Sequence, residues 1–268
     1  MTRARPEGVC HRPVRPHLLP RPEPRENPMP APEITVASYN IHKGIGTDRR
    51  RDLRRTSAVI AELDADLVAL QEADRRFGDR AGLLDLEHLR AETGLVPVQV
   101  EGSGRAHGWH GNLLLVREAE VEEVHKIVLP GFEPRGALMI DLLMHGRPLR
   151  VIAAHLGLLP GSRAAQTRHL LERIEAGAPR PTLLMGDLNE WRGSGAAMSH
   201  LARHFTGAVM VRSFPSRFPI LALDRLMTCK HGRLQDVVPH DTPLARRASD
   251  HLPIKARLHL PERIAAAS

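Results

Sequence analysis

The hydrophobic and polar positions follow the periods of regular secondary structure from about residue 33 onward. Alternating positions over Ile34–Asn40 predict a β-strand. Apolar residues at helical spacing predict one helix with Leu53, Ile60 and Leu63 on a single face, and another helix over Ala164–Ala176. Further apolar runs predict strands over Asp66–Glu72, Leu113–Val116, Leu138–Leu143, Leu149–His155, Thr182–Gly186, Leu221–Met227 and Pro253–Leu258. Strands interleaved with helices are typical of an α/β domain, which we place at residues 33–262, followed by a short tail at 263–268.

The first 32 residues have a different composition. They hold nine of the 22 prolines and almost no periodic apolar pattern. Such a segment buries too little apolar surface to offset the entropy of folding, so we expect it to be disordered. Its arginines are not followed by an uninterrupted apolar stretch, so it is a poor secretory signal. An alternative is that Met29 is the true start and that residues 1–28 are a mis-assigned extension.

The composition excludes several classes of protein. With 268 residues, 42% hydrophobic and 26% charged, the chain can bury a full core and is not wholly disordered. Its longest stretch without a charged residue, Val151–Ser162, is shorter than the roughly 20 apolar residues of a membrane span. The two cysteines, Cys10 and Cys229, are too few for a disulfide framework or a Cys-rich zinc site. We therefore expect a soluble, cytoplasmic protein without a transmembrane segment, and we treat it as a monomer.

The charge permits a polyanionic partner without requiring one. Of the net charge of +7, the first 32 residues contribute +3, since they hold six Arg and three Glu, and +4 remains for the rest. The strongest basic cluster is Arg49–Arg55, which we interpret as a solvated helix face or, alternatively, as a surface that follows a phosphate backbone. Five Phe, two Trp and one Tyr are too few for a broad platform that stacks on single-stranded nucleic acid.

Residues suited to metal or phosphate chemistry adjoin one predicted strand after another. In α/β sheets, ligands bind in the crevice beyond the strand ends. Carboxylates in such a crevice are destabilised by desolvation unless a cation or a hydrogen-bond donor compensates them. The residues at these positions are Asn40, Glu72, His155, Asp187, Asn189, Asp224, Asp250 and His251.

Each of these residues also has an ordinary structural interpretation. Asp187 and Asn189 are common turn formers, and Glu72 could cap a helix or pair with Arg75 or Arg76. Ser249-Asp250 could begin a helix, although the apolar run after it looks more like a strand. His155 and His251 would each be unremarkable alone among 16 histidines. Turns and caps do not explain why the pattern recurs at so many strands.

Six short motifs follow one another in a fixed order. They are Ser-Tyr-Asn40, Leu-Gln-Glu72, Ala-His155-Leu, Gly-Asp187-Leu-Asn189, Leu-Asp224-Arg and Ser-Asp250-His251. The series resembles that of the endonuclease/exonuclease/phosphatase superfamily, which includes DNases, abasic-site endonucleases, sphingomyelinases and inositol-polyphosphate phosphatases. The resemblance covers about residues 34–260, and it is specific because all the motifs occur in order. The segments Asn40-Ile-His-Lys-Gly44 and Gly-Asp-Leu-Asn-Glu-Trp191 are similar to a small bacterial branch.

The resemblance implies a four-layer α/β/β/α sandwich, in which two mixed sheets are flanked by helices, and it implies a Mg²⁺ cofactor that Mn²⁺ could replace. It makes Glu72 the main metal ligand, with Asn40 and Asp250 beside it. These residues offer oxygen ligands, which Mg²⁺ prefers. Three further residues match the family less specifically as phosphate or substrate contacts: Asn112, Arg135 and Trp191.

The resemblance also implies catalytic roles. Asp187 corresponds to the residue that orients or deprotonates the attacking water, and Asn189 to a donor for that water and the phosphate. His251 corresponds to a histidine at the phosphate, with Asp224 behind it, and His155 to a second histidine of the DNase and sphingomyelinase branches. A carboxylate behind a histidine fixes its tautomer and favours the imidazolium form.

The sequence therefore predicts a Mg²⁺-dependent phosphoester hydrolase. We expect a phosphodiesterase that acts on nucleic acid; the alternative substrate is a phospholipid headgroup or a small phosphodiester. Ala-His155-Leu-Gly stands where abasic-site endonucleases have a tyrosine-bearing segment, which disfavours dedicated abasic-site repair. Phe214–Ile220 could form a small apolar rim for a lipid. A binding module that has lost the chemistry is a third hypothesis, which the retained motifs disfavour.

Overall fold

The computed structural model describes residues 33–75, 78–206 and 209–260. The expected tails at 1–32 and 263–268 lie outside the described residues, as does the expected alternative partner of Glu72 at position 76.

Two six-stranded sheets form the centre of the domain. The first has the order β11 (Arg233–Pro239), β12 (Ile254–His259), β1 (Ile34–Asn40), β2 (Leu67–Gln71), β4 (Leu113–Val116), β3 (Val96–Pro97). The second has the order β5 (Ala119–Leu129), β6 (Arg135–Met144), β7 (Arg147–His155), β8 (Thr182–Asp187), β10 (Asp224–Cys229), β9 (Phe205–Thr206). Both sheets are mixed, because β1 and β2 are parallel in the first and β7 and β8 in the second, while the other neighbours are antiparallel.

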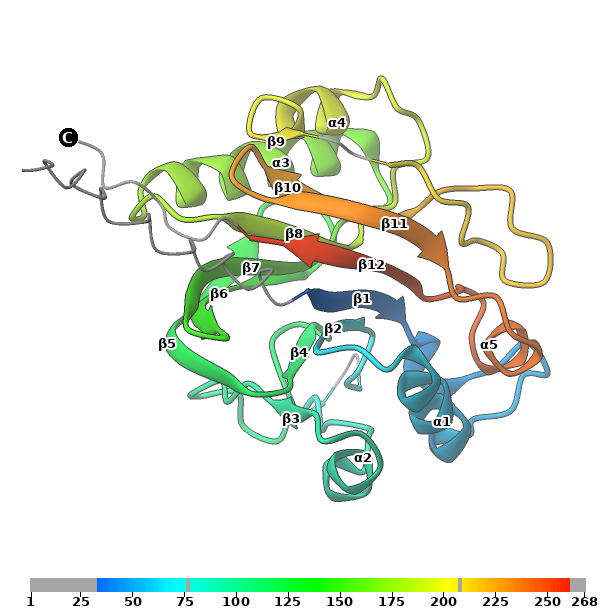
Figure 1. Ribbon diagram of the computed structural model, residues 1–268. Helices are drawn as coiled ribbons and strands as arrows, with labels where there is room; N and C mark the ends of the chain where they lie inside the picture. Colours follow the sequence, from blue (N-terminus) through cyan, green and yellow to red (C-terminus); the bar gives the residue numbers. More distant parts are fainter. Residues whose placement is uncertain (1–32, 76–77, 207–208, 261–268) are drawn as a thin grey trace, which may run out of the picture. The chain divides into compact units, whose positions relative to one another are not determined.

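The main hydrophobic core lies between the inner faces of the sheets. Val36 and Leu67 from the first sheet and Ile140, Val151 and Leu226 from the second belong to one buried cluster. The outer faces are covered by helices, which makes four layers (Figure 1). The first sheet carries α1 (Leu53–Leu63), α2 (Leu86–Thr93) and α5 (Pro243–Ala248), and the second carries α3 (Pro160–Glu175) and α4 (Ala196–Leu201). The four-layer α/β/β/α sandwich implied by the motifs is thereby confirmed.

Burial on both faces explains the apolar runs of the central strands. In β1, Val36 belongs to the core between the sheets, while Ala37 and Tyr39 belong to the cluster beneath the helices. A strand covered on both sides needs apolar residues at nearly every position. Truncation of one such residue, for example Ile140→Ala, should destabilise the fold by about 2–5 kcal/mol.

None of the four edge strands was predicted from the sequence: β5 and β11, and the two-residue strands β3 and β9. β5 and β11 are mostly exposed or half-buried, and in β5 the charged residues Glu120, Glu122, Glu123 and Lys126 interrupt the apolar ones. A solvated edge strand has little apolar pattern because only part of one face needs burial. The expected strand Leu221–Met227 was also misplaced, since β10 begins only at Asp224.

The interpretation of Arg49–Arg55 as a helix face is wrong for most of the cluster. Helix α1 begins at Leu53, after Asp52, whose side chain accepts a hydrogen bond from the Arg55 amide and caps the helix. Asp48 accepts two hydrogen bonds from the Arg55 guanidinium and one from Arg247. These ion pairs occupy arginines that could otherwise follow a phosphate backbone.

Candidate active site

Strand register brings the predicted residues to one edge of the sheets. The parallel pairs β1–β2 and β7–β8 end together, with Asn40 opposite Gln71 and His155 opposite Asp187. Asp224 is the first residue of β10, and because β10 is antiparallel to β8, it lies opposite Asp187. Asp250 and His251 likewise precede β12, which runs antiparallel to β1. A residue at the start of an antiparallel strand thus lies beside residues at the ends of the neighbouring strands. The sequence does not show this, because it does not tell which strands pair or in which direction they run.

Asp187 lies at the centre of this group. Its Oδ2 accepts a hydrogen bond of 3.0 Å from Asn40 Nδ2. The same oxygen is 3.4 Å from His155 Nε2 and 3.8 Å from His251 Nε2. Asn40 and Asp187 are 147 positions apart in the chain and both are buried. Fixed donors therefore surround a buried carboxylate, an arrangement that can hold charge away from solvent.

Asp224 lies behind His251, as the motif series implied. His251 Nδ1 is 2.9 Å from Asp224 Oδ2, so opposite ring nitrogens face Asp224 and Asp187. Ser213 Oγ also donates to Asp224 Oδ2. Ser213 was missed because a lone serine far from any motif carries no sequence signal. The ring of Phe214 packs against His251 with centroids 4.8 Å apart.

The two histidines have opposite charge preferences. Burial lowers the pKa of His251, but Asp224 and Asp187 outweigh it and raise that pKa to about 10. Burial also lowers the pKa of His155, and here it prevails together with Arg135 against Asp187, so the pKa falls to about 4. At neutral pH, His251 is an imidazolium and His155 is a neutral imidazole.

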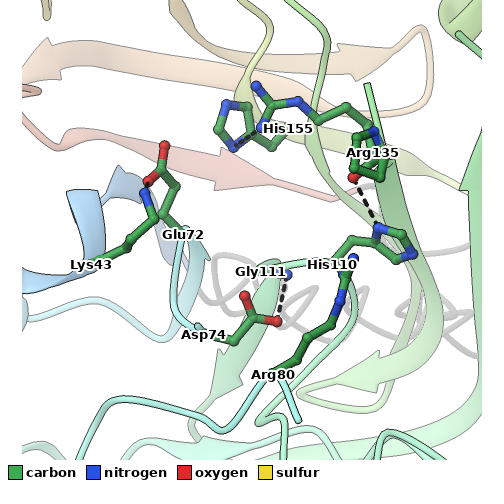
Figure 2. A pocket seen from close by; sticks show the side chains of 9 residues that line it. Lys43, Glu72, Asp74, Arg80, His110, Gly111, Arg135 and His155 are labelled. Carbon is green, nitrogen blue, oxygen red and sulfur yellow. Dashed lines mark hydrogen bonds and ion pairs between the residues drawn. The ribbon is translucent and has the colours of Figure 1, made fainter. Parts of the chain in front are cut away.

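Arg135 contacts His155 directly. Its Nη1 lies 3.1 Å from His155 Nδ1 (Figure 2). An arginine only donates, so Nδ1 is the acceptor and the proton of neutral His155 is on Nε2, which faces Asp187. Asn112 stabilises strand β6, which begins at Arg135, because its Nδ2 donates to the carbonyl of Gly136. Arg135 thus lies at the site, whereas Asn112 mainly holds backbone.

Glu72 lines a pocket that adjoins the group around Asp187, because His155 belongs to both. Lys43 Nζ forms an ion pair with Glu72, and Figure 2 shows the two side chains pointing toward one another. Neither Arg75 nor a helix cap takes this place. Burial raises the pKa of Glu72, but the hydrogen bond from Lys43 outweighs it and the pKa lies below its ordinary value. The same pocket is lined by Asp74, Arg80, His110, Gly111, Pro134, Arg135 and His155.

The oxygen ligands fit a hard cation. Glu72 is ionised and half-buried, and Lys43 supplies the positive charge that this carboxylate requires. Asn40 Oδ1 accepts a hydrogen bond from the His42 amide and keeps a further lone pair, and the half-buried Asp250 is 3.5 Å from His42 Nδ1. These donors match the preference of Mg²⁺ for oxygen.

Another group also brings potential ligand atoms close together. One atom each from Asp187, Asp224 and His251 lies within 4.8 Å of the others. We interpret this group as a hydrogen-bonded relay, because Asp224 occupies Nδ1 of His251 and Asp187 faces Nε2. A metal bound there would have to displace the hydrogen bond that holds the ring.

Asn189 forms a turn, and its side chain also lies beside the Asp187 group. Its amide donates to Asp187 Oδ1 at 2.9 Å, with φ of 51°, which is a turn closed by an aspartate. Its Nδ2 donates to the Leu156 carbonyl at 2.9 Å, which fixes the side chain between β7 and β8. Trp191, by contrast, lies exposed at the rim, and the Arg192 guanidinium lies 4.7 Å from its ring centroid.

Comparison with known proteins shows the family of the chain. The family described as "Endonuclease/Exonuclease/phosphatase family" matches residues 37–251, an interval that contains every predicted site residue from Asn40 to His251. The chain belongs to the endonuclease/exonuclease/phosphatase family. Members of this family hydrolyse phosphoesters, and they generally use a divalent metal.

Relatives of this endonuclease/exonuclease/phosphatase family protein span most of its length. YbhP of Escherichia coli (strain K12) is 31% identical, over 84% of this chain and 96% of YbhP. Mannosyl-6-phosphatase Bt3783 of Bacteroides thetaiotaomicron has a TM-score of 0.65 at 16% identity, over 85% of this chain and 100% of that one. TDP2 of D. rerio, solved with a single-strand DNA product, has a TM-score of 0.64 at 16% identity, over 85% and 99%. At these identities the two structures show a shared fold.

Among the residues that the structure describes, none of the helices combines the length and the apolar character needed to cross a membrane.

Proposed function

We propose that the chain is a Mg²⁺-dependent phosphodiester hydrolase. The observation that carries the proposal is the environment of Asp187, whose Oδ2 lies 3.0 Å from Asn40 Nδ2 and 3.4 Å and 3.8 Å from the Nε2 atoms of His155 and His251. A carboxylate among amide and imidazole donors can take a proton from water while the donors face the developing negative charge. No serine or cysteine nucleophile is required.

Glu72, with Asn40 and Asp250, would hold the Mg²⁺, and Mn²⁺ would substitute for it. When bound, the ion neutralises charge on the phosphate oxygens and polarises the phosphorus. The proposal rests on the oxygen donors of these three side chains; Lys43, which forms an ion pair with Glu72, would have to release that carboxylate oxygen to the ion.

The side chains of the protein would position the water and handle the protons of the reaction. Asp187 orients the water and accepts its proton, and Asn189 holds the loop that carries it, through the hydrogen bond to Leu156. His251 is charged at neutral pH because Asp224 and Asp187 outweigh burial, so its Nε2–H can stabilise a phosphate oxygen or protonate the leaving group. Asp224 accepts from Nδ1 and keeps the ring in place.

Neutral His155 has a different task. Its Nδ1 is held by Arg135 and its Nε2–H faces Asp187, so it donates without adding charge. Arg135 lines the Glu72 pocket and offers a guanidinium to a phosphate oxygen.

The structure offers arguments both for and against a nucleic acid as the substrate. A nucleic acid is favoured by the net charge of +7, and TDP2, which shares the fold, was solved with a DNA product. Against a nucleic acid, Asp48 forms ion pairs with Arg55 and Arg247. Arg55 of the Arg49–Arg55 cluster is therefore less free to contact a phosphate backbone. A cytoplasmic location belongs to the proposal as well, because two cysteines suit a reducing compartment. The choice between a nucleic acid and a phospholipid headgroup therefore depends on the surface around the site.

A substrate panel tests the reaction. The purified chain is incubated with bis(p-nitrophenyl) phosphate, plasmid DNA, RNA and phospholipids in Mg²⁺, with and without a chelator. We expect hydrolysis that requires the metal, that needs a higher Mg²⁺ concentration in Glu72→Gln, and that is unchanged in Glu123→Gln, which alters an exposed carboxylate on β5. Hydrolysis of every accepted substrate in excess chelator would refute the metal assignment.

A further inference from the structure

Large apolar side chains lie exposed along one border of the candidate site. We call the following six residues, which are between 48% and 91% exposed, the apolar arc: Phe132, Leu158, Trp191, Met210, Phe218 and Ile220. Scattered single exposed apolar residues are normal on protein surfaces, but a contiguous set marks an interaction site.

Four members of the arc line two adjoining pockets, and the other two lie on the neighbouring loop segments. Leu158 and Trp191 line one surface pocket, and Trp191, Met210 and Ile220 line the next. Phe218 lies two residues before Ile220, in the loop between β9 and β10. At the other end, Glu133 accepts a hydrogen bond from the Leu158 amide, which holds the Phe132 loop against the Leu158 loop.

The arc adjoins the proposed catalytic residues. Asn189 lines the same pocket as Leu158 and Trp191. The Ile220 amide donates to the carbonyl of Phe214, whose ring packs on His251. In Figure 1 the long loop before β10 extends on the side to which the arrowhead of β1 points, which is the edge that carries Asn40. A substrate that reaches Asp187 therefore passes beside an apolar border.

Basic side chains lie beside the arc: Arg192, Arg212 and Arg217 belong to the loops that carry Trp191, Met210, Phe218 and Ile220. The two carboxylates that border the arc are already engaged, Glu133 by the Leu158 amide and Glu190 by Arg163. Arg192 lies over the Trp191 ring, and Arg212 lines the pocket that Trp191, Met210 and Ile220 share. Basic side chains beside exposed apolar ones match a surface that is apolar inside and anionic at its boundary.

We propose that the apolar arc docks on membranes that contain anionic phospholipids and thereby brings a headgroup phosphodiester to the site. An amphiphilic phosphoester is the substrate class that combines a phosphate with apolar material next to it. A nucleic acid fits less well, because half of the arc (Leu158, Met210 and Ile220) has no ring to stack on a base, whereas a membrane accommodates aromatic and aliphatic side chains alike. The delivery of a substrate rests on the proposed phosphodiesterase function, whereas membrane docking does not depend on it.

Trp191 provides a direct reporter. The chain has two tryptophans, and Trp109 is half-buried, with its Nε1 bonded to the Ile127 carbonyl. In Trp109→Phe, the fluorescence comes from Trp191 alone. We expect its emission to shift to shorter wavelength with vesicles of phosphatidylcholine and phosphatidylglycerol, and to shift much less with phosphatidylcholine alone.

Variants of the arc test the docking surface by co-sedimentation with the same vesicles. Phe218→Ser/Ile220→Ser should lower vesicle affinity by at least about tenfold, since each side chain loses part of the stabilisation of an apolar group leaving water. Val121→Ser is the matched control, because Val121 is also exposed but lies on β5, opposite Leu142, at the far end of the sheet from His155. Equal binding by the arc variant and the wild type, or no binding by the wild type, overturns the proposal.

Two further readouts separate the possible failures. Oligothymidylate replaces the vesicles in a parallel titration; if it quenches Trp191 and binds through Phe218 and Ile220 while vesicles do not bind, the arc is a nucleic-acid surface and the proposal is wrong. Hydrolysis of soluble bis(p-nitrophenyl) phosphate reports the reaction independently of docking. Hydrolysis without vesicle binding overturns the docking alone, whereas vesicle binding without hydrolysis of any phosphodiester overturns the proposed function and leaves the docking supported.

Discussion

His251 and Asp224 should act as a unit in catalysis and in stability. Asp224 is fully buried and its Oδ2 is 2.9 Å from His251 Nδ1, while Ser213 donates to the same oxygen. In the described part of the chain, Asp224 Oδ1 has no hydrogen-bond partner, and the His251 ring and the Ser213 hydroxyl supply the side-chain hydrogen bonds to this carboxylate. Removal of the ring therefore has two consequences, a lost donor at the phosphate and an uncompensated buried charge.

The magnitudes follow from these contacts. His251→Ala should lower kcat by about 10²–10⁴-fold, the range for a lost acid or base. It should also destabilise the fold by about 3–5 kcal/mol, the cost of removing one partner of a buried ion pair. For a domain of this size, that corresponds to a decrease in Tm of roughly 6–20 °C. Asp224→Asn should reduce kcat less, because it disturbs the charge and the tautomer but leaves the ring in place.

The double variant distinguishes a unit from two independent residues. If the pair acts together, His251→Ala/Asp224→Asn should be little slower than His251→Ala and more stable than it, because the uncompensated carboxylate is gone. The assays are single-turnover hydrolysis of bis(p-nitrophenyl) phosphate at a temperature where all variants are folded, and thermal unfolding by circular dichroism. Multiplicative losses in kcat, or a double variant no more stable than His251→Ala, would refute the reasoning.

Four other outcomes are expected. Glu72→Gln should raise the Mg²⁺ concentration needed for half-maximal activity while Tm in metal-free buffer changes little, as a metal titration and a melting curve would show. Asp141→Ala should lower stability by about 3–5 kcal/mol, because it strands the buried Arg150 that Asp141 binds at 2.7 Å and 2.8 Å, yet leave kcat of the folded fraction unchanged; a matching loss of kcat in stopped-flow assays would contradict this. Arg55→Gln should leave the salt dependence of any DNA binding unchanged, because Asp48 holds the guanidinium; a shallower slope in a salt titration would show that Arg55 contacts phosphate. Because the pKa of His251 is raised from 6.5 to about 10, its charged form adds stability that is complete below about 6.5 and lost as the pH rises through about 10, so Tm should fall over that interval in the wild type and less in His251→Gln.

The sequence by itself determined the elements whose patterns are local. Central strands such as β4 and β7 were predicted because burial on both faces demands an uninterrupted apolar run, which is visible along the chain. The order of the motifs identified the family, because each motif is a few consecutive residues. For the same reason the sequence alone predicted Asn40, Glu72, Asp187 and His251 as site residues.

The tertiary structure decided everything that depends on partners distant in the chain. The antiparallel register places Asp224 opposite Asp187, and no local pattern encodes which strand pairs with which. Edge strands such as β5 remained hidden because solvent imposes no periodicity on their exposed positions. Arg247 reaches Asp48 across 199 positions and shares it with Arg55, so one arginine of the basic cluster is held by an ion pair that no local pattern predicted. The apolar arc likewise exists only after folding, because its members come from four separate loops that approach one another once the sheets have packed.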